Sequence, residues 1–275
     1  MRAQLQGIDH VVVLVRDLDK AREAYMRMGF TPTPRGLHTL GSQNHCLMFG
    51  RDYVELLAVP RAHPATQHFT DFLARGEGLG AIALATDDAN ALHANLAADG
   101  IAADAPLDFS RPVDGLGEAR FRIVQLPPHA SPGCRMFACQ HYTRELVWRA
   151  DYRRHANGAV EIAAVAIVAE DAAAAAASYG KLFDARPQEI EEGLLVQTGS
   201  APIALASRWK LGHRLHGVGL PLRPRPLAAA LFIRVADRAT TAKVLRRNGL
   251  EPVALADGSL AVSAQDAHGV AVVFG

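Results

Sequence analysis

The feature that most constrains the fold of this chain is a unit that recurs four times. In each copy a short apolar strand ends at an acidic residue, and that acid begins a helix. The four acids are Asp17, Asp88, Asp171 and Asp237. The copies are roughly 65 to 85 residues apart, which leaves room for one helix and about three further strands in each. A repeat of this size predicts four similar supersecondary units.

Local chemistry explains where these helices begin and end. An aspartate at the N-cap accepts hydrogen bonds from the free amides of the first turn and suits the positive end of the helix dipole. Gly29, Gly100 and Gly249 stand where three of the helices need a left-handed C-terminal cap. The strand before the first helix is apolar on both faces apart from Asp9 and His10, which is typical of a strand that is covered on both sides.

Further strand segments follow each helix. In the first copy, residues 44–49 and 53–59 are separated by Gly-Arg-Asp, a hairpin turn signal. The corresponding segments of the other copies are residues 118–126, 135–142, 194–198, 202–206, 259–263 and 270–274. The chain is therefore predicted to have an α+β fold of four βαβββ modules in two pairs. Each pair is expected to form a cupped mixed β-sheet with helices on its outer face.

A polar, arginine-rich stretch, TRELVWRADYRRHANGA, separates the second copy from the third. We place a domain boundary in this stretch, so that the domains are residues 1–150, with the candidate site, and residues 151–275. A second irregular stretch, residues 207–226, contains several prolines, glycines and arginines, Arg225 among them. Such composition predicts a long loop over the rim of the second domain.

Composition excludes several classes of partner. The chain of 275 residues has 29 lysine and arginine residues against 28 aspartate and glutamate residues, a balance that offers no electrostatic footprint for nucleic acid or an acidic membrane surface. No apolar stretch is long enough for a signal peptide or a membrane span. Cys46, Cys134 and Cys139 lack CxxC spacing, which favours reduced thiols and a cytoplasmic location over disulfides or a structural zinc site.

Two polar residues stand out in the apolar strands of the first copy. His10 lies mid-strand, with Ile8, Val12 and Leu14 expected on the same face, and Glu55 lies in the otherwise apolar strand YVELLAV. A buried carboxylate is costly unless it finds a cation, a metal or a hydrogen-bond donor. Neutral imidazole together with carboxylate is ligand chemistry typical of divalent transition metals. A direct hydrogen bond between the two side chains, with no metal, is the alternative.

Residues 8–30 and the segment NHCLMFGRDYVELLAV, residues 44–59, resemble the vicinal oxygen chelate superfamily. That superfamily includes glyoxalase I, bleomycin-resistance proteins and extradiol dioxygenases. The chain is most similar to its glyoxalase-like domain proteins, whose pattern contains DHVV, a glycine and histidine like GLH at residues 36–38, an Asn-containing strand and a Tyr-x-Glu-Leu strand. The resemblance implies that His10 and Glu55 occupy metal-ligand positions.

The other copies depart from the family pattern at these positions. Ala81, Ala164 and Ala230 stand where His10 stands in the first copy, and Val273 stands where metal-binding relatives typically have glutamate. None of these side chains can bind a metal. The second domain is therefore expected to be mainly structural, with any metal site in the first domain.

The third metal ligand is predicted to be His141, in FACQHY on the last strand of the second copy. The alternative for this residue is a histidine in a turn at the rim. His38 and His45 are nearer in sequence to the other two ligands, although His45 is expected to face the helices instead of the cavity. His155, between the domains, is a further candidate.

Several residues are predicted to bind the substrate. Arg120 and Arg122 alternate along one predicted strand and share a face. If that face is the concave one, the two side chains would hold a carboxylate or enolate through paired hydrogen bonds. The alternative is that they form the solvent face of the strand. Asn44, Gln140 and Tyr142 are also predicted to donate hydrogen bonds to a substrate oxygen, if they too face the concave side.

Two functional hypotheses follow. The first is a metal-dependent lyase or isomerase for a small substrate with adjacent oxygen atoms, in which His10, Glu55 and His141 bind Zn²⁺, Ni²⁺, Co²⁺ or Fe²⁺ and the last two residues also act in catalysis. The second is a metal-free small-molecule binding protein of the same fold, which the ligand-poor second domain favours. An Fe(II) ring-cleaving dioxygenase ranks below both, because the resemblance implies that dioxygenase ligands come from the C-terminal domain. The sequence leaves open whether the protein forms a homodimer.

Overall fold

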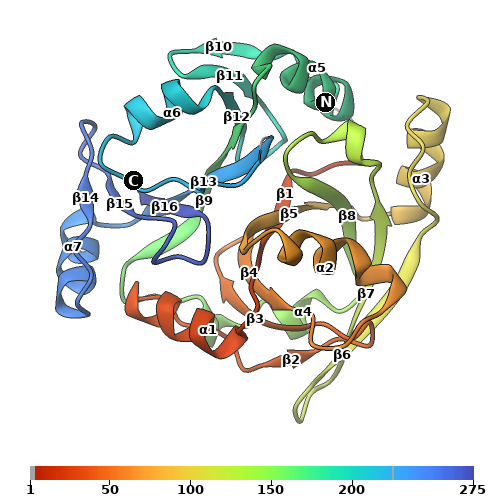
Figure 1. The fold of residues 1–275 in the computed structure, drawn as a ribbon. Coiled ribbons are helices and arrows are strands. Elements are labelled where there is room, and N and C mark those ends of the chain that lie inside the picture. The colour runs from red at the N-terminus through yellow and green to blue at the C-terminus, as the bar shows by residue number, and fades with distance from the viewer. Residues whose placement is uncertain (1–3, 225) are drawn as a thin grey trace.

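The computed structural model describes residues 4–224 and 226–275, so Arg225 lies outside the described residues. Within the described residues the chain forms two eight-stranded mixed β-sheets with helices around them (Figure 1). The first sheet has the strand order β2-β3-β4-β1-β5-β8-β7-β6. Its strands are β1 (Ile8–Leu14), β2 (Gly36–Leu37), β3 (Gln43–Met48), β4 (Tyr53–Ala58), β5 (Gly78–Ala85), β6 (Leu107–Val113), β7 (Gly117–Gln125) and β8 (Arg135–His141).

The second sheet repeats this arrangement in the order β10-β11-β12-β9-β13-β16-β15-β14. Its strands are β9 (Ala159–Val168), β10 (Gln188–Ile190), β11 (Gly193–Val196), β12 (Ile203–Ala206), β13 (Leu227–Val235), β14 (Val253–Ala254), β15 (Leu260–Val262) and β16 (Ala271–Phe274). In both sheets two antiparallel central strands join the modules, β1 with β5 and β9 with β13. Each central strand also pairs in parallel with the last strand of its own module.

One helix follows the first strand of each module. These helices are α1 (Leu18–Arg27), α3 (Ala89–Ala98), α5 (Ala172–Phe183) and α7 (Arg238–Arg247). The side chains of Asp17, Asp88, Asp171 and Asp237 accept hydrogen bonds from amides of the first turn, as the N-cap pattern predicts. The predicted α+β fold of four βαβββ modules in two pairs is confirmed.

Further helices lie outside the repeated modules. They are the α-helices α2 (Gln67–Ala74), α4 (Arg144–Val147) and α6 (Arg208–Arg214) and the 3-10 turns η1 (Pro64–Thr66), η2 (Pro128–Ala130) and η3 (Ala150–Tyr152). The prediction of a loop throughout residues 207–226 is therefore wrong at its start. Ser207 caps α6, and Leu211 and Leu215 pack into the apolar inner cluster of the second sheet, which stabilises the helix.

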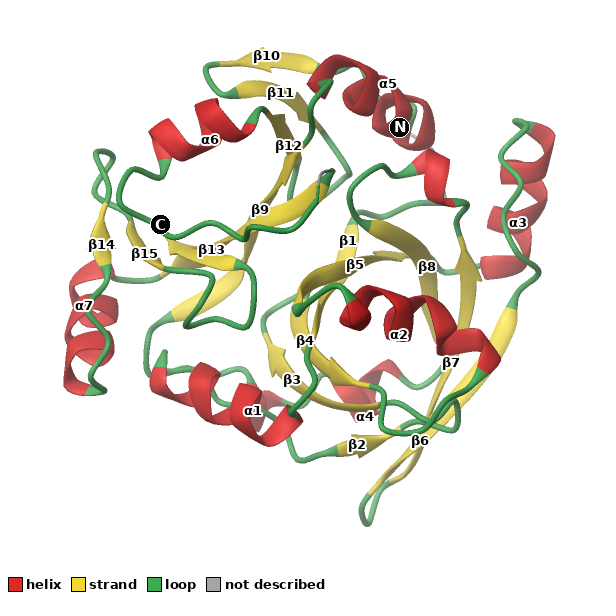
Figure 2. Ribbon diagram, in the orientation of Figure 1, coloured by secondary structure: helices red, strands yellow, loops and turns green. Residues whose placement is uncertain are grey.

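The first sheet curves until its two edges meet. Thr39 N, just after β2, donates to Ser110 O of β6 at 3.0 Å, and Ser110 N donates to Thr39 Oγ1 at 3.2 Å. The sheet is therefore nearly a closed barrel, and α2 lies across the ring of strands in Figure 2. Phe69 of α2 packs into the apolar cluster on the inner face of the barrel.

The two halves of the chain share one hydrophobic core. The outer faces of both sheets and the helices α1, α3 and α5 contribute to a single buried cluster. Tyr25 of α1 donates its hydroxyl to Ala267 O of the second half at 3.3 Å, and the rings of Phe30 and Phe274 lie 5.9 Å apart. The predicted boundary at residue 150 falls between β8 and β9, in a segment that belongs to neither sheet.

The inner face of the second sheet is apolar. Ala230 and Val273, two of the positions where the family pattern would have a ligand, lie in a buried cluster with Ala166 and Val168. Leu211 of α6 covers this cluster from the open side of the sheet. The inner face of the second half is therefore filled by its own side chains.

The expectations from composition concerned membrane spans and the state of the cysteines. No helix formed by the described residues combines the length and the apolar character needed to cross a bilayer. Cys46, Cys134 and Cys139 are buried and unpaired. Burial raises the pKa of the Cys46 thiol to about 12, so this side chain is a neutral thiol at physiological pH.

Asn157 ties the end of α1 to the start of β9, and its loss should destabilise the protein. Its side chain is fully buried, donates to Met28 O at 2.9 Å and accepts from Ala159 N at 3.0 Å. We expect Asn157→Ala to lower the free energy of unfolding in urea by roughly 2–4 kcal/mol, because two buried backbone groups lose their partners. Asn248→Ala is the matched control, since half-buried Asn248 bonds to the carbonyl of Arg27 at the end of the same helix.

The control should change the free energy of unfolding by no more than about 0.5 kcal/mol. Equal effects of the two substitutions would contradict the assignment of Asn157 as the buried tie between the halves.

Candidate functional site

A β-bulge in β1 turns two consecutive polar side chains to the inner face of the barrel. The register of β1 against β5 shifts between Ile8 and His10, so Asp9 is an extra residue on β1. Ile8 and Val11 belong to the outer core cluster and Val12 to the inner one, which leaves Asp9 and His10 together on the inner side. The expectation that Ile8 shares a face with His10 is wrong, because the bulge interrupts the alternation of the strand.

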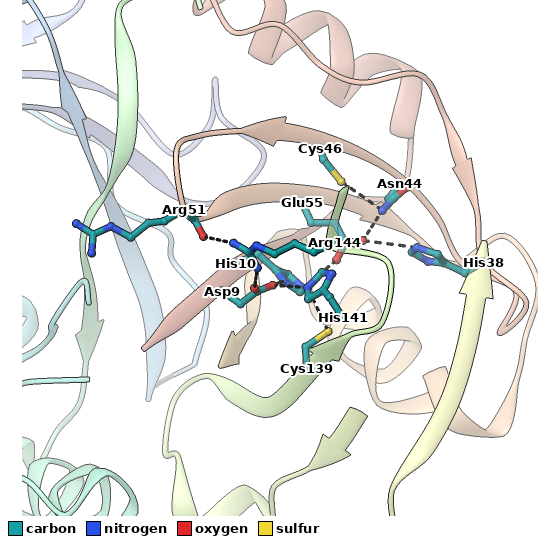
Figure 3. Close-up of polar contacts among 10 residues, drawn as sticks. All are labelled: Asp9, His10, His38, Asn44, Cys46, Arg51, Glu55, Cys139, His141 and Arg144. Atoms are coloured by element: carbon teal, nitrogen blue, oxygen red, sulfur yellow. Dashed lines mark hydrogen bonds and ion pairs between the residues drawn. The ribbon is translucent and has the colours of Figure 1, made fainter. Parts of the chain in front are cut away.

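His10 is held between two carboxylates (Figure 3). Its Nδ1 is 2.7 Å from Asp9 Oδ2, and its Nε2 is 3.6 Å from Glu55 Oε2. The imidazole stacks on the ring of Tyr53, with centroids 4.3 Å apart. Since His10 is only 4% exposed, these contacts fix the ring and aim Nε2 at Glu55.

Asp9 is ionised although it is buried. Its Oδ2 also lies 3.0 Å from His141 Nε2, and Arg144 Nη1 is 3.5 Å from its Oδ1. Burial works to raise the pKa of Asp9, but the charge and hydrogen bonds of His141 and His10 outweigh it and hold the pKa well below its usual range. Because an ionised carboxylate can only accept, His10 donates through Nδ1, which leaves Nε2 to act as a base or a ligand.

Glu55, on β4, is supported by side chains from the neighbouring strands. Asn44 Nδ2 on β3 donates to Glu55 Oε1 at 2.6 Å, and His38 Nε2 lies 4.0 Å from the same oxygen. Burial lowers the pKa of His38 to about 4 despite the nearby Glu55 charge, so its imidazole is neutral at pH 7. His38 Nδ1 is fixed by Ser42 Oγ at 2.8 Å.

These groups line a small cavity of about 60 Å³ inside the barrel. Its walls are rich in aromatic side chains, among them Phe109, Phe121 and Phe137, and Phe69 of α2 closes one side. Arg111 of β6 supplies a guanidinium to the wall. In such apolar surroundings the attraction between Arg111 and an anionic ligand is stronger than in water.

The arginines predicted to bind substrate do not face this cavity. Phe121 lies between Arg120 and Arg122 on β7 and occupies the inner face, so both arginines are turned outward. Arg122 forms a bidentate pair with Asp108, with both contacts at 2.6 Å. Of the predicted substrate donors, Asn44 does line the cavity.

Gln140 and Tyr142 also lie away from the cavity. Gln140 is on the outer face of β8, where its Oε1 accepts from Ala89 N at 3.1 Å and its Nε2 donates to Asp87 O at 2.6 Å. It therefore supports the start of α3. Tyr142 follows the end of β8 and is 44% exposed. The inner face of β8 is formed by alternate residues such as Cys139.

The four histidines considered as the third metal ligand have different contacts in the structure. His141 contacts Asp9, and its Nδ1 is buried with no hydrogen-bond partner in the described part of the chain. His38 reaches the cavity beside Glu55. His45 and His155 both bond to backbone groups, His45 through Nδ1 at 2.7 Å and His155 through both nitrogens.

Asp9 and Arg111 are charged groups of this site that are not predicted from the sequence. Asp9 stands out as the neighbour of His10 in an apolar strand, but only the bulge against β5 turns it inward. Arg111 lies on the mixed-polarity edge strand DFSRPV, and its place on the wall depends on the meeting of β6 with β2. The alternation of Phe109 with Arg111 is the sequence signal that shows they share a face.

Glu55 lies at a suitable distance from each of two imidazoles for a shared divalent transition metal, but His10, Glu55 and His38 do not form a set of three ligand atoms within 4.8 Å of one another. Two ligands bound at about 2.0–2.2 Å to one ion lie roughly 3–4 Å apart. The 3.6 Å from Glu55 Oε2 to His10 Nε2 and the 4.0 Å from Glu55 Oε1 to His38 Nε2 fall in this range, each through a different carboxylate oxygen. Both imidazoles also have their second nitrogen fixed, by Asp9 and by Ser42, as is usual for metal-binding histidines.

Among the described residues, the group that does bring three potential ligand atoms together shares His10 and lies next to this pair of contacts. The potential ligand atoms of Asp9, His10 and His141 are all within 4.8 Å of one another. In this group, however, Asp9 Oδ2 is already hydrogen-bonded to both imidazoles, at 2.7 and 3.0 Å. Asp9 is therefore better placed to orient His10 than to bind an ion.

The sequence of the chain was compared with models of known protein families. Residues 8–183 match the model of a family described as a glyoxalase-like domain, which is more than half of the chain. The chain belongs to this family. Its resemblance to the glyoxalase-like domain proteins of the vicinal oxygen chelate superfamily is thereby confirmed. The matched region extends past β8 to the end of α5. No curated protein sequence matches the chain.

Two solved structures show the same fold over nearly the whole chain, and a third is similar in sequence to half of it. A hypothetical protein from Staphylococcus aureus is 14% identical, with a TM-score of 0.71, and the match covers 98% of each chain. A mutant of 4-hydroxymandelate synthase from Streptomyces coelicolor is 13% identical, with a TM-score of 0.62 over 98% of this chain and 92% of that chain. Methylmalonyl-CoA epimerase from Streptomyces coelicolor is 26% identical over 50% of this chain and 99% of its own, with a TM-score of 0.40.

Gly36 of β2 leaves the space that Asn44 and Arg111 occupy. A methyl group at this position would lie 2.3 Å from Asn44 Oδ1 and 3.0 Å from Arg111 Cδ. We expect Gly36→Ala to displace Asn44 from Glu55 and to cost roughly 1–3 kcal/mol of stability, the usual range for overpacking. NMR of the Asn44 side-chain amide should show the loss of its hydrogen bond, and thermal unfolding should show the loss of stability.

Gly50→Ala is the control, because a methyl group there meets no atom within 4 Å. An unchanged Asn44 amide signal in Gly36→Ala would contradict the proposed packing.

Proposed function

We propose that this protein is a metal-dependent isomerase or lyase that moves a proton on a small anionic substrate with adjacent oxygen atoms. The observation that carries this proposal is the convergence of Glu55, His10 and His38 on one apolar cavity that also contains Arg111. Two imidazole nitrogens and a carboxylate are the ligands expected for Zn²⁺, Ni²⁺, Co²⁺ or Fe²⁺. When bound, such an ion supplies Lewis-acid stabilisation of a carbonyl or enolate oxygen.

His10, Glu55 and His38 would hold the metal, which replaces His141 of the sequence hypothesis by His38. Asn44 orients the Glu55 carboxylate through Oε1, and Oε2 remains directed at His10. In the proposed reaction a carboxylate oxygen of Glu55 accepts the proton from the carbon next to the substrate carbonyl. His141 acts as a positioning residue, because it reaches His10 only through Asp9.

Arg111 and the aromatic wall determine which substrates fit. A guanidinium presents paired donors to a carboxylate or an enediolate. The aromatic side chains exclude water, which strengthens that contact and protects a carbanion-like intermediate from side reactions. The small volume of the cavity favours substrates of a few carbon atoms or the reactive end of a longer molecule.

A metal-free small-molecule binding protein is the second candidate. The observation that favours it is that each ring nitrogen of His10 already has a carboxylate near it, Asp9 at 2.7 Å and Glu55 at 3.6 Å. In that case Arg111 and Asn44 would bind an anionic ligand directly. Metal-dependent stabilisation of the protein separates the two candidates.

Glu55→Gln should abolish metal binding without disturbing the fold. At a hundredfold excess over Kd, a bound metal ion should raise the Tm of the wild-type protein by roughly 5–10 °C, because it binds only the folded state. The glutamine keeps the shape of the side chain but removes its charge, so the rise should disappear. The measurement is thermal unfolding with each of Zn²⁺, Ni²⁺, Co²⁺ and Fe²⁺, together with elemental analysis of the protein as purified.

Glu77→Gln is the matched control, because Glu77 also pairs with a histidine, His268, at 2.8 Å outside the cavity. It should retain the full metal-induced rise. If Glu55→Gln retains it too, the ion binds elsewhere and the metal-site proposal fails. If wild-type protein shows no rise with any of the four ions, the binding-protein alternative is favoured.

A further inference from the structure

A second cavity lies at the seam between the two halves of the molecule. It has a volume of about 320 Å³ and is bounded by α2, by the segment that leads into β8 and by residues just before β13. Phe69 of α2 lines both this cavity and the candidate active site. The two spaces are therefore neighbours on either side of one aromatic side chain, but they contain different polar groups.

Arg223 extends from the second half into this seam cavity. Its guanidinium lies over the ring of Phe72 at 4.0 Å from the centroid. Its Nε and Nη2 are buried and have no hydrogen-bond partner among the described residues. Gly76 and Gly78 make this close approach possible, since a methyl group at either position would lie 2.9 Å from an atom of the arginine side chain. The side chain is thus packed tightly in place without an acceptor.

Other donors in the seam cavity also lack partners. Ser131 Oγ and His68 Nε2 are buried with no hydrogen-bond partner in residues 4–224 and 226–275. Arg135, on the same wall, has Nε 3.3 Å from the neutral side chain of Gln125. Buried polar groups in folded proteins are normally hydrogen-bonded, so donors without a protein partner are available to a ligand, an ion or water.

The charge of the seam cavity is strongly positive. Arg75, Arg135 and Arg223 line it, against the single carboxylate of Asp71 among the described lining residues. Asp71 is engaged by Gln67, whose Nε2 donates to it at 2.9 Å. Burial, and for Arg223 also the neighbouring Arg75, lowers the pKa of both Arg135 and Arg223, which shows that these cations are poorly solvated.

We infer that the seam cavity is a binding site for the oxyanion group of a small molecule, a phosphate or a carboxylate. A desolvated guanidinium without a counter-ion is costly, and a bound oxyanion removes that cost. Arginine donors match the geometry of phosphate and carboxylate oxygens, and Ser131 and His68 add neutral donors on the same wall. The same set of groups disfavours a metal cation or a purely apolar ligand. This site is independent of the reaction proposed above.

Inorganic phosphate is the first probe for this site. Isothermal titration of the full-length protein, with chloride keeping the ionic strength constant, should show one binding event. Arg223→Gln should weaken phosphate binding about tenfold or more, as expected for the loss of a charge-assisted hydrogen bond. Arg122→Gln removes the same charge from the outer face of the barrel and should leave the affinity unchanged.

The stability of the variant without phosphate distinguishes a ligand site from a structural one. Because Arg223 is a half-buried cation whose buried Nε and Nη2 have no acceptor among the described residues, Arg223→Gln should unfold at the same temperature as the wild type or at a higher one when phosphate is absent. A large loss of stability in chloride alone would mean that Arg223 is a packing residue and would overturn the inference. Ser131→Ala, a smaller change on the same wall, should also weaken phosphate binding while the protein stays folded.

A parallel titration with acetate separates the two oxyanion sources. Binding of phosphate but not acetate assigns the site to phosphorylated ligands, and binding of both assigns it to oxyanions in general. The inference is overturned if neither anion binds beyond the chloride control. It is also overturned if Arg223→Gln and Arg122→Gln bind phosphate as well as the wild type does.

Discussion

The buried chain of Asp9, His10 and Glu55 is the arrangement on which the candidate site depends. Two carboxylates and an imidazole are taken out of water together, and each is tolerable only because the next one is hydrogen-bonded or close to it. His141 and Arg144 complete the compensation of the Asp9 charge. The β-bulge is the backbone feature that makes this possible, because an unbroken β1 would turn Asp9 into the outer apolar core.

The four modules share a topology, but the inner faces of the two sheets differ in polarity. In the first sheet the inner face is interrupted by polar groups, and the strands nearly close around them. In the second sheet Ala230, Val273 and their neighbours fill the inner face with apolar side chains, which α6 covers. The second half also shares the outer core with α1 and extends Arg223 into the seam, so the binding site that we infer for it lies at the junction of the halves.

Local sequence patterns predict the modules well, because they depend on interactions within a few residues. Each N-cap aspartate and each hairpin signal acts on its own segment, and His10 and Glu55 stand out as polar groups in apolar strands. The direction of Arg120 and Arg122 instead depends on which face of β7 the barrel encloses, and that is decided by pairing with distant strands. The inward turn of Asp9 and the helix α6 likewise depend on long-range packing.

The protonation state of the His10 ring tests this account most directly. In nitrogen-15 NMR of the histidine side chains, with assignment by His10→Gln, the account predicts that Nδ1 of His10 carries a hydrogen that is shared with Asp9. In Asp9→Asn this signal should shift, because the ionised acceptor is gone. A ring that carries its hydrogen on Nε2 alone, with Nδ1 bare, would contradict the account, since Nε2 would then be unable to act as a base or a ligand in the cavity.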